Sequence, residues 1–227
     1  MQRNANFIIN LSPKKLAIYL LIVPMLFFIV QIIVSIGFKS YSEKFTLFSS
    51  VSGAIYLVAI LSIVFLWIFW LRSVVLHTTA SQLGSKLKWF QIAFASFVFF
   101  IIFNLAATII DFLTTYLQWT DTYGFLFNAP REFVNAFGIL IAYPIICHYA
   151  ARATIATRNG EPATFVKAIP FTLVLIFGTV LGIPFLHQYF NDATPKKSQL
   201  IPIYVIAIGL CMLLFIIGFI AAITGKV

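Results

Sequence analysis

The chain has 227 residues, of which 62% are hydrophobic and 9% are charged, and its formal net charge is +9. Soluble domains contain about 45–50% apolar and about 25% charged residues, so this composition excludes a fold with an ordinary water-exposed surface. The basic residues are scattered in ones and twos beside apolar segments, which argues against nucleic acid as a partner. We therefore expect the lipid bilayer to be the solvent for most of the chain.

Six apolar stretches are long enough to cross a membrane. A helix needs roughly 20 apolar residues to span about 30 Å of hydrocarbon, where its backbone must satisfy its own hydrogen bonds. The stretches cover residues 16–36, 51–71, 89–113, 133–151, 168–186 and 200–224. The first is too long for the core of a signal peptide, so we expect it to be retained. The sequence predicts an all-α, polytopic membrane bundle of about six transmembrane helices, in a single domain over 1–227 with no soluble domain.

The orientation follows from the basic residues, which concentrate on the cytoplasmic side of membrane proteins. With the N-terminus inside, ten Lys and Arg residues fall inside and five outside. The inner residues are Arg3, Lys14, Lys15, Arg72, Lys86, Lys88, Arg152, Arg158, Lys167 and Lys226; the outer ones are Lys39, Lys44, Arg131, Lys196 and Lys197. This bias predicts both termini in the cytoplasm (N-in/C-in), with anionic lipids of the cytoplasmic leaflet as partners.

The third stretch carries a polar stripe on one helical face, formed by Asn104, Thr108, Asp111 and Thr115. A polar or ionisable group at membrane depth faces protein or a water-filled cavity and is a candidate for function. One hypothesis is therefore that the stripe lines an outward-facing vestibule. The alternative is that Asn104 and Thr108 form hydrogen bonds between helices while Asp111 is solvated at the headgroups.

The inner end of the fourth stretch carries His148 and Arg152 four residues apart, on one helical face. Arg158 and Lys167 flank the turn that follows. The four residues could contact a phosphate, an anionic lipid or a cytosolic partner. They could equally be charges that set the topology, with a histidine at the interface.

Small residues in the fifth and sixth stretches indicate close helix packing. Gly178 and Gly182 have GxxxG spacing, and Gly218 and Ala222 belong to a similar seam in the last helix. Such residues let helices approach closely, within the chain, in a self-associated form or against other membrane subunits. Pro24, Pro144 and Pro184 lie inside apolar stretches, where each removes a helix hydrogen bond and favours a kink.

Motifs for catalysis, cofactors and metals are missing from the sequence, so we expect no cofactor, no metal site and no enzyme. Cys147 and Cys211 lie in apolar runs, as small residues packed between helices do. The alternative is a membrane-embedded enzyme that uses His187 with Asp192, five residues later, for acid–base chemistry at the outer surface.

The segment 138–191, with Arg152, Glu161 and Phe165, is similar to small polytopic membrane proteins of bacteria. This resemblance implies a multi-pass protein of the bacterial inner (cytoplasmic) membrane, and it implies no activity. From the residues, the leading interpretation is a non-enzymatic membrane protein, either a subunit of a larger membrane complex or a small transporter permease.

Overall fold

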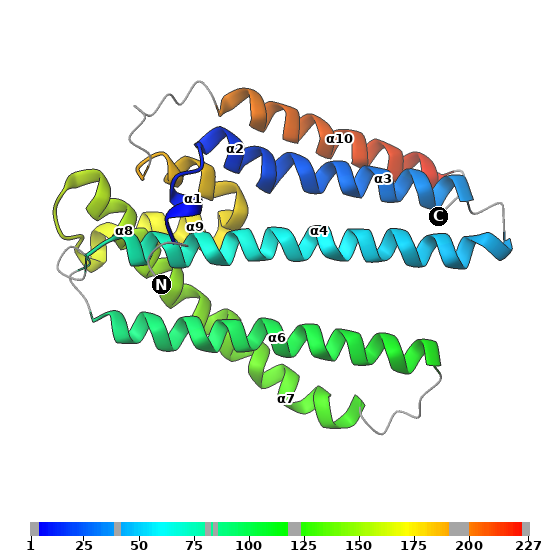
Figure 1. Cartoon of the computed structure of the whole chain (residues 1–227), viewed down its shortest axis with the longest axis horizontal. Coiled ribbons are helices and arrows are strands. Elements are labelled where there is room, and N and C mark those ends of the chain that lie inside the picture. Colours follow the sequence, from blue (N-terminus) through cyan, green and yellow to red (C-terminus); the bar gives the residue numbers. More distant parts are fainter. Residues whose placement is uncertain are drawn as a thin grey trace. The chain divides into compact units, whose positions relative to one another are not determined.

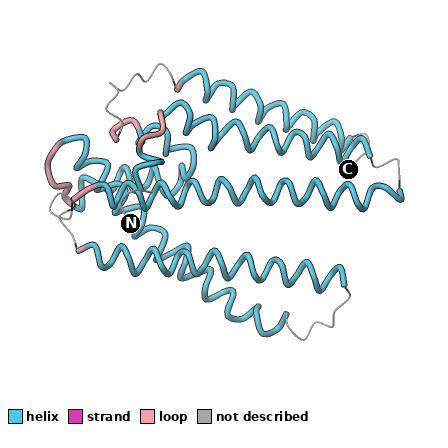
Figure 2. The backbone as a smooth tube through the Cα atoms, in the orientation of Figure 1, coloured by secondary structure: helices cyan, strands magenta, loops and turns pink. Residues whose placement is uncertain are grey.

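The protein is a bundle of membrane helices. The structure, a computed structural model, describes residues 5–38, 42–79, 83, 86–117, 124–190 and 200–223, and all regular elements in these ranges are helices (Figure 2). Six helices are long and apolar enough to cross a membrane: Pro13–Ile33, Ala59–His77, Leu87–Ile110, Pro130–Asn159, Phe165–His187 and Ile201–Ile220. They correspond to the six predicted stretches, so the predicted polytopic helical bundle is confirmed.

Large apolar side chains cover the outside of these helices. Phe177 is 82% exposed, Phe215 75% and Leu140 72%. Soluble proteins rarely expose large contiguous apolar patches, whereas a bilayer solvates such side chains readily. The surface therefore agrees with the composition in requiring lipid around the helices.

The chain divides into two compact units, Met1–Ser73 with Gly178–Val227, and Val74–Phe177. The first unit contains α1 (Ala5–Ile9), α2 (Pro13–Ala17), η1 (Ile18–Ile22), α3 (Val23–Phe38) and α10 (Ile201–Ile223). The second contains α6 (Leu87–Leu117), α7 (Gly124–Phe137), η2 (Gly138–Ala142) and α8 (Tyr143–Asn159). Two helices, α4 (Ser42–His77) and α9 (Phe165–His187), contribute residues to both units.

The first span begins sharply. The Ser12 hydroxyl accepts a hydrogen bond from the Lys15 backbone N–H at 3.3 Å, and Pro13 occupies the first turn. A serine cap satisfies one of the backbone donors left free at a helix start, and proline is favoured at the first position because it has no N–H to satisfy. The exposed Lys14 and Lys15 follow directly, at the entry of the span.

Two spans carry the same local irregularity, a π-helical turn that ends two residues before a proline. In the first span, η1 precedes Pro24, and the Val23 N–H bonds to the Ile18 carbonyl. In the fourth span, η2 precedes Pro144, and the Tyr143 N–H bonds to the Gly138 carbonyl. A proline leaves the carbonyl four residues earlier without a donor, and a wider turn redistributes the remaining hydrogen bonds.

In the first unit the last helix runs parallel to the first span. Ala17, at the start of the first span, forms a buried cluster with Leu200 and Ile203 at the start of α10; Ile18, Ile22 and Tyr204 surround it. α10 also packs against α3, and the two helices lie side by side in Figure 1. The starts of the two helices therefore lie at the same end of this unit.

The fifth helix is interrupted. Thr179 has φ 37° and ψ −114°, which breaks α9 into a segment before Gly178 and a shorter one after it. At its far end, the His187 ring bonds to the carbonyl of Leu11, which precedes the first span. The end of α9 thus lies at the same end of the unit as the starts of the first and last helices. Six alternating crossings with N-in/C-in would instead make α10 antiparallel to the first span.

In the second unit, α6 packs closely against η2 and α8. A Cβ atom on Gly138 would lie 2.5 Å from Cγ of Phe100, so only glycine allows the helices to approach this far. Aromatic rings continue the contact, with Phe97 stacked on Tyr143 at 5.3 Å and Phe90 against Tyr149 at 5.7 Å between ring centroids.

We expect epitope tags to report the termini on opposite sides of the membrane. Tags near the N-terminus and between residues 191 and 199 should be accessible from the same side, and a tag after Val227 only from the other side. Protection of each tag from protease in sealed vesicles measures this. A C-terminal tag that shares the side of the N-terminal tag would contradict the parallel course of α10.

Gly138→Ala should lower the free energy of unfolding by about 1–3 kcal/mol, because Phe100 or the helices must move apart. Denaturation in detergent micelles measures the change. Gly209→Ala is the matched control, because among the described residues no heavy atom outside the helix's own backbone lies within 4 Å of a Cβ placed there. The control should be neutral or stabilising, as alanine favours a helix over glycine.

Candidate functional site: the broken fifth helix

The break in α9 places strained backbone inside an apolar stretch. Thr179 is the only non-glycine residue with positive φ among the described residues. A β-branched residue in this region costs on the order of 1–3 kcal/mol and persists only where the surroundings hold it. Five residues later, Pro184 has no N–H to donate to the Val180 carbonyl. The strained backbone at Thr179 and the missing hydrogen bond at Pro184 therefore both lie in the second half of α9.

Contacts with α10 hold the segment after the break. The Tyr204 hydroxyl donates a hydrogen bond to the Leu181 carbonyl, and the Tyr204 ring stacks on Phe185 at 4.6 Å between centroids. Tyr204 therefore supplies both a donor and an apolar surface to this segment.

His187 fixes the end of the same segment through both ring nitrogens. The Trp70 indole N–H donates to Nδ1 at 3.1 Å, so Nδ1 is the unprotonated nitrogen. Nε2 therefore carries the proton and donates to the Leu11 carbonyl at 2.7 Å. Both side chains are fully buried, and Phe190 packs edge-on against the Trp70 indole. A histidine thus joins α4, α9 and the N-terminal segment.

This environment bears on the possible pairing of His187 with Asp192. Both nitrogens of His187 are occupied by structural hydrogen bonds, and the ring has no exposed surface. Asp192 lies outside the described residues. A general base needs a nitrogen within reach of the substrate proton, and His187 offers none in this arrangement.

In the second unit, the described part of the polar stripe forms hydrogen bonds within and between helices. The Asn104 amide donates to Asn135 Oδ1 at 2.7 Å, which joins α6 to α7, and to the Phe100 carbonyl at 2.9 Å. The exposed Thr108 donates to the Asn104 carbonyl. The side chains of Asp111 and Thr115 lie outside the described residues, so a vestibule along the stripe stays a prediction.

The structure brings together part of the predicted basic cluster at the end of α8. His148 Nδ1 lies 3.0 Å from the Thr172 hydroxyl on α9. The centroids of the His148 and Phe165 rings lie 4.3 Å apart. Arg152 Nη2 donates to the Ala163 carbonyl at 2.9 Å. Arg158, in the last turn of α8, and Lys167, in the first turn of α9, are exposed.

The predicted packing residues lie in different environments. Gly182 is buried and Gly178 is half-buried, on either side of the break. At Gly218, no heavy atom of another described element lies within 4 Å of an added Cβ, and Cys211 is exposed. The side chain of Ala222 lies outside the described residues. Their role in helix association stays a prediction.

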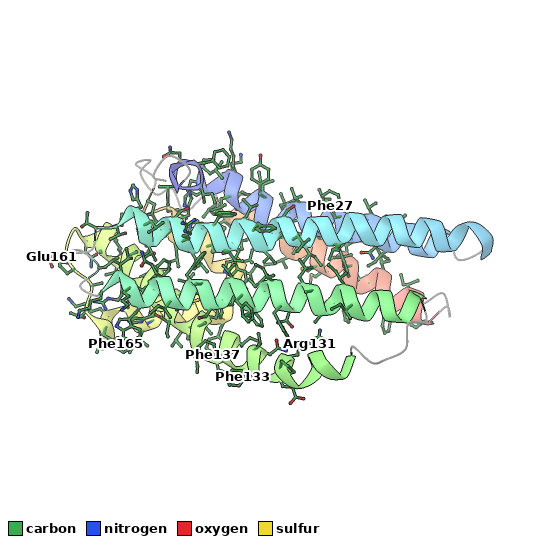
Figure 3. The ribbon with its side chains drawn as sticks, turned by 60° about the horizontal axis from the view of Figure 1, so that its bottom comes forward. Phe27, Arg131, Phe133, Phe137, Glu161 and Phe165 are labelled. Atoms are coloured by element: carbon green, nitrogen blue, oxygen red, sulfur yellow. The ribbon has the colours of Figure 1, made fainter. Side chains whose placement is uncertain are left out.

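A groove of about 360 Å³ in the second unit is lined by Ala95, Ser96 and Phe99 of α6 and by Phe133, Val134 and Phe137 of α7. Figure 3 labels Phe133 and Phe137 on α7. Ser96 supplies the only polar side chain of this lining, which suits an acyl chain better than a polar solute.

We expect the Trp70–His187 hydrogen bond to stabilise the fold. In a double-mutant cycle with Trp70→Phe, His187→Phe and the double variant, the coupling energy should be about 1 kcal/mol, because each single variant leaves one buried partner unpaired. Detergent denaturation measures the four stabilities. Trp89→Phe, at a tryptophan that is 63% exposed, is the control. Additive effects would show that the bond contributes nothing.

No family model matches the chain, and neither a curated protein nor a solved structure matches it. Within the described residues, no group of three or more His, Cys, Asp or Glu side chains could hold a metal ion.

Proposed function

We propose that this membrane protein is a small transporter permease and that the broken fifth helix forms part of its solute pathway. The observation that carries the proposal is the interruption at Thr179. Thr179 lies fourteen residues after the start of α9 at Phe165, roughly 21 Å along a helix. A hydrocarbon core is about 30 Å thick, so a break at this distance falls inside the membrane.

A helix break at that depth needs a physical reason. Free backbone N–H and C=O groups cost several kcal/mol in lipid, and irregular backbone occurs at membrane depth only where protein buries it or where it lines a water-filled cavity. Half-helices of transporters present such groups to their solutes. Tyr204 satisfies the Leu181 carbonyl, whereas Pro184 leaves the Val180 carbonyl without its helical donor.

The π-helical turns give independent support. They occur at the same spacing before Pro24 and Pro144, in the first and fourth spans, which run in opposite directions across the membrane in the predicted topology. Inverted halves with corresponding interrupted helices are typical of secondary transporters. π-turns inside helices are also frequent at functional sites.

A second candidate, a subunit of a membrane complex, is favoured by the outer face of α10. Among the described residues, no heavy atom outside the helix's own backbone lies within 4 Å of a Cβ added to Gly218, and Cys211, seven residues earlier on the same helical face, is exposed. Small residues on an open face allow a helix of another chain to approach closely. This candidate expects a stoichiometric partner in mild detergent, and Gly218→Leu should release that partner.

The transport proposal is tested with the purified chain in liposomes, using potassium chloride, inorganic phosphate and glycerol as first solutes. We expect flux above protein-free liposomes for at least one solute. Thr179→Pro should reduce that flux at least about tenfold, because proline fixes φ near −65° and cannot adopt the observed φ of 37°.

Thr179→Gly is the matched control, because glycine adopts positive φ without strain and keeps the break. It should retain the flux and the fold. Equal flux from the wild type and Thr179→Pro would contradict a role of the break. A chain that gives no flux and copurifies with a defined partner would support the complex subunit instead.

A further inference from the structure

The hydrogen bonds around His148 define which of its nitrogens carries a proton. The Thr172 hydroxyl donates its one hydrogen to the Ala168 carbonyl at 2.8 Å. Toward His148 it can therefore only accept, so Nδ1 of His148 is the protonated nitrogen. The other nitrogen, Nε2, is then a bare acceptor. It is buried and has no hydrogen-bond partner among the described residues.

Arg152 presents the complementary group one turn further along α8. Its Nη2 bonds to the Ala163 carbonyl, but its Nε–H is buried and has no partner in the described part of the chain. No described carboxylate forms an ion pair with this guanidinium, and Glu161, the acid nearest in sequence, is exposed. A half-buried positive charge without a counter-charge is costly.

The missing partner can be specified from these two atoms. It must accept a hydrogen bond from a guanidinium N–H, share a proton with an imidazole nitrogen and compensate a positive charge. A water molecule meets the first two requirements and fails the third. A phosphate group meets all three, because its oxygens accept from arginine and a proton can reside on one of them or on Nε2.

We propose that His148 and Arg152 form a binding site for a phosphate group, carried by an anionic lipid headgroup or free in solution. The site lies on α8, and Arg158 and Lys167, which follow it in sequence, are exposed; the sequence predicts that all four residues lie on the cytoplasmic side. Basic pockets on that side bind the headgroups of anionic lipids. This site is separate from the proposed role of Thr179 and does not depend on it.

The loop after α8 provides the route to the buried atoms. Gly160 ends α8 with φ 71°, a left-handed conformation that glycine adopts freely, and residues 159–162 are exposed. The loop is closed onto Arg152 by the bond to the Ala163 carbonyl. A phosphate oxygen replaces that carbonyl as a stronger acceptor, because its negative charge strengthens the bond to arginine. Phe165 packs on His148 and is 62% exposed, so it offers an apolar surface for an acyl chain beside the headgroup. Figure 3 labels Phe165 and Glu161.

The test measures the rise in unfolding temperature of the full purified chain with three additives: short-chain phosphatidic acid, inorganic phosphate and short-chain phosphatidylcholine. The wild type should be stabilised by phosphatidic acid, and Arg152→Gln should weaken the apparent affinity by about tenfold or more, as expected for loss of a charge-assisted hydrogen bond. Arg158→Gln, on the same helix, is the control and should change the affinity far less. Thr172→Val keeps both His148 and Arg152 but removes the acceptor that orients His148, so it should give an intermediate loss.

The outcomes test the proposed site and identify the source of its phosphate group. A response to inorganic phosphate and to phosphatidic acid, both lost in Arg152→Gln, identifies the phosphate itself as the ligand. A response to phosphatidic acid alone identifies a lipid headgroup. If Arg152→Gln does not fold, Arg152→Lys and Thr172→Val provide the comparison, because lysine keeps the charge but lacks the guanidinium fork. Equal affinities in the wild type, Arg152→Gln and Thr172→Val, or no stabilisation by either phosphate compound, would overturn the site and leave a buried water as the occupant.

Discussion

The structure depends on one constraint: in hydrocarbon, each backbone N–H and C=O group must find a partner within the protein. Uninterrupted helices meet this constraint by themselves, which is why apolar stretches of this length become helices. Every interruption then needs an explicit compensation. In the first unit the hydroxyl of Tyr204 reaches a carbonyl just beyond the break at Thr179, and His187 reaches the carbonyl of Leu11. In the second unit Tyr143 donates to the Leu175 carbonyl, whose helical donor would have been the N–H of Thr179. Tyrosine and histidine serve this purpose because each combines a large apolar surface with a polar atom at its tip.

The fold class could be predicted from composition because the bilayer leaves few alternatives. The span positions followed from apolar length alone, without any motif. The break in the fifth helix could not be predicted in this way, because hydropathy records how apolar a segment is and contains no information about its backbone conformation. Gly178 and Thr179 were visible only as part of a GxxxG spacing, which usually indicates packing rather than a break. Pro184 was the better local signal, since it guarantees a free carbonyl, but proline is common in membrane helices and most such helices continue past it.

The polar sites, like the helices, could be predicted only in part. A sequence pattern can place Asn104 and Thr108 on one face, and it can place His148 and Arg152 on another. It cannot identify Asn135, Thr172 or the Ala163 carbonyl as their partners, because those residues belong to other elements brought close by packing. His187 illustrates the limit most clearly. In sequence it stands near an acidic residue, which suggests chemistry, whereas in the fold it contacts Trp70, 117 residues away, and a backbone carbonyl 176 residues away.

Arg152 connects the charge of the chain to its structure. Positive charge beside a span normally orients the helix by remaining in water, and such residues need no specific partner. Arg152 differs because its Nε is buried and its guanidinium is bound to a loop carbonyl rather than solvated. A residue that served only to set the orientation would gain nothing from this burial and would lose hydration energy. The same charge on a solvated side chain, as on the exposed Lys14 or Lys15, orients the helix equally well. The burial of Arg152 therefore makes sense if an anion compensates its charge, and the bare nitrogen of His148 on the same helical face restricts that anion to one that can share a proton.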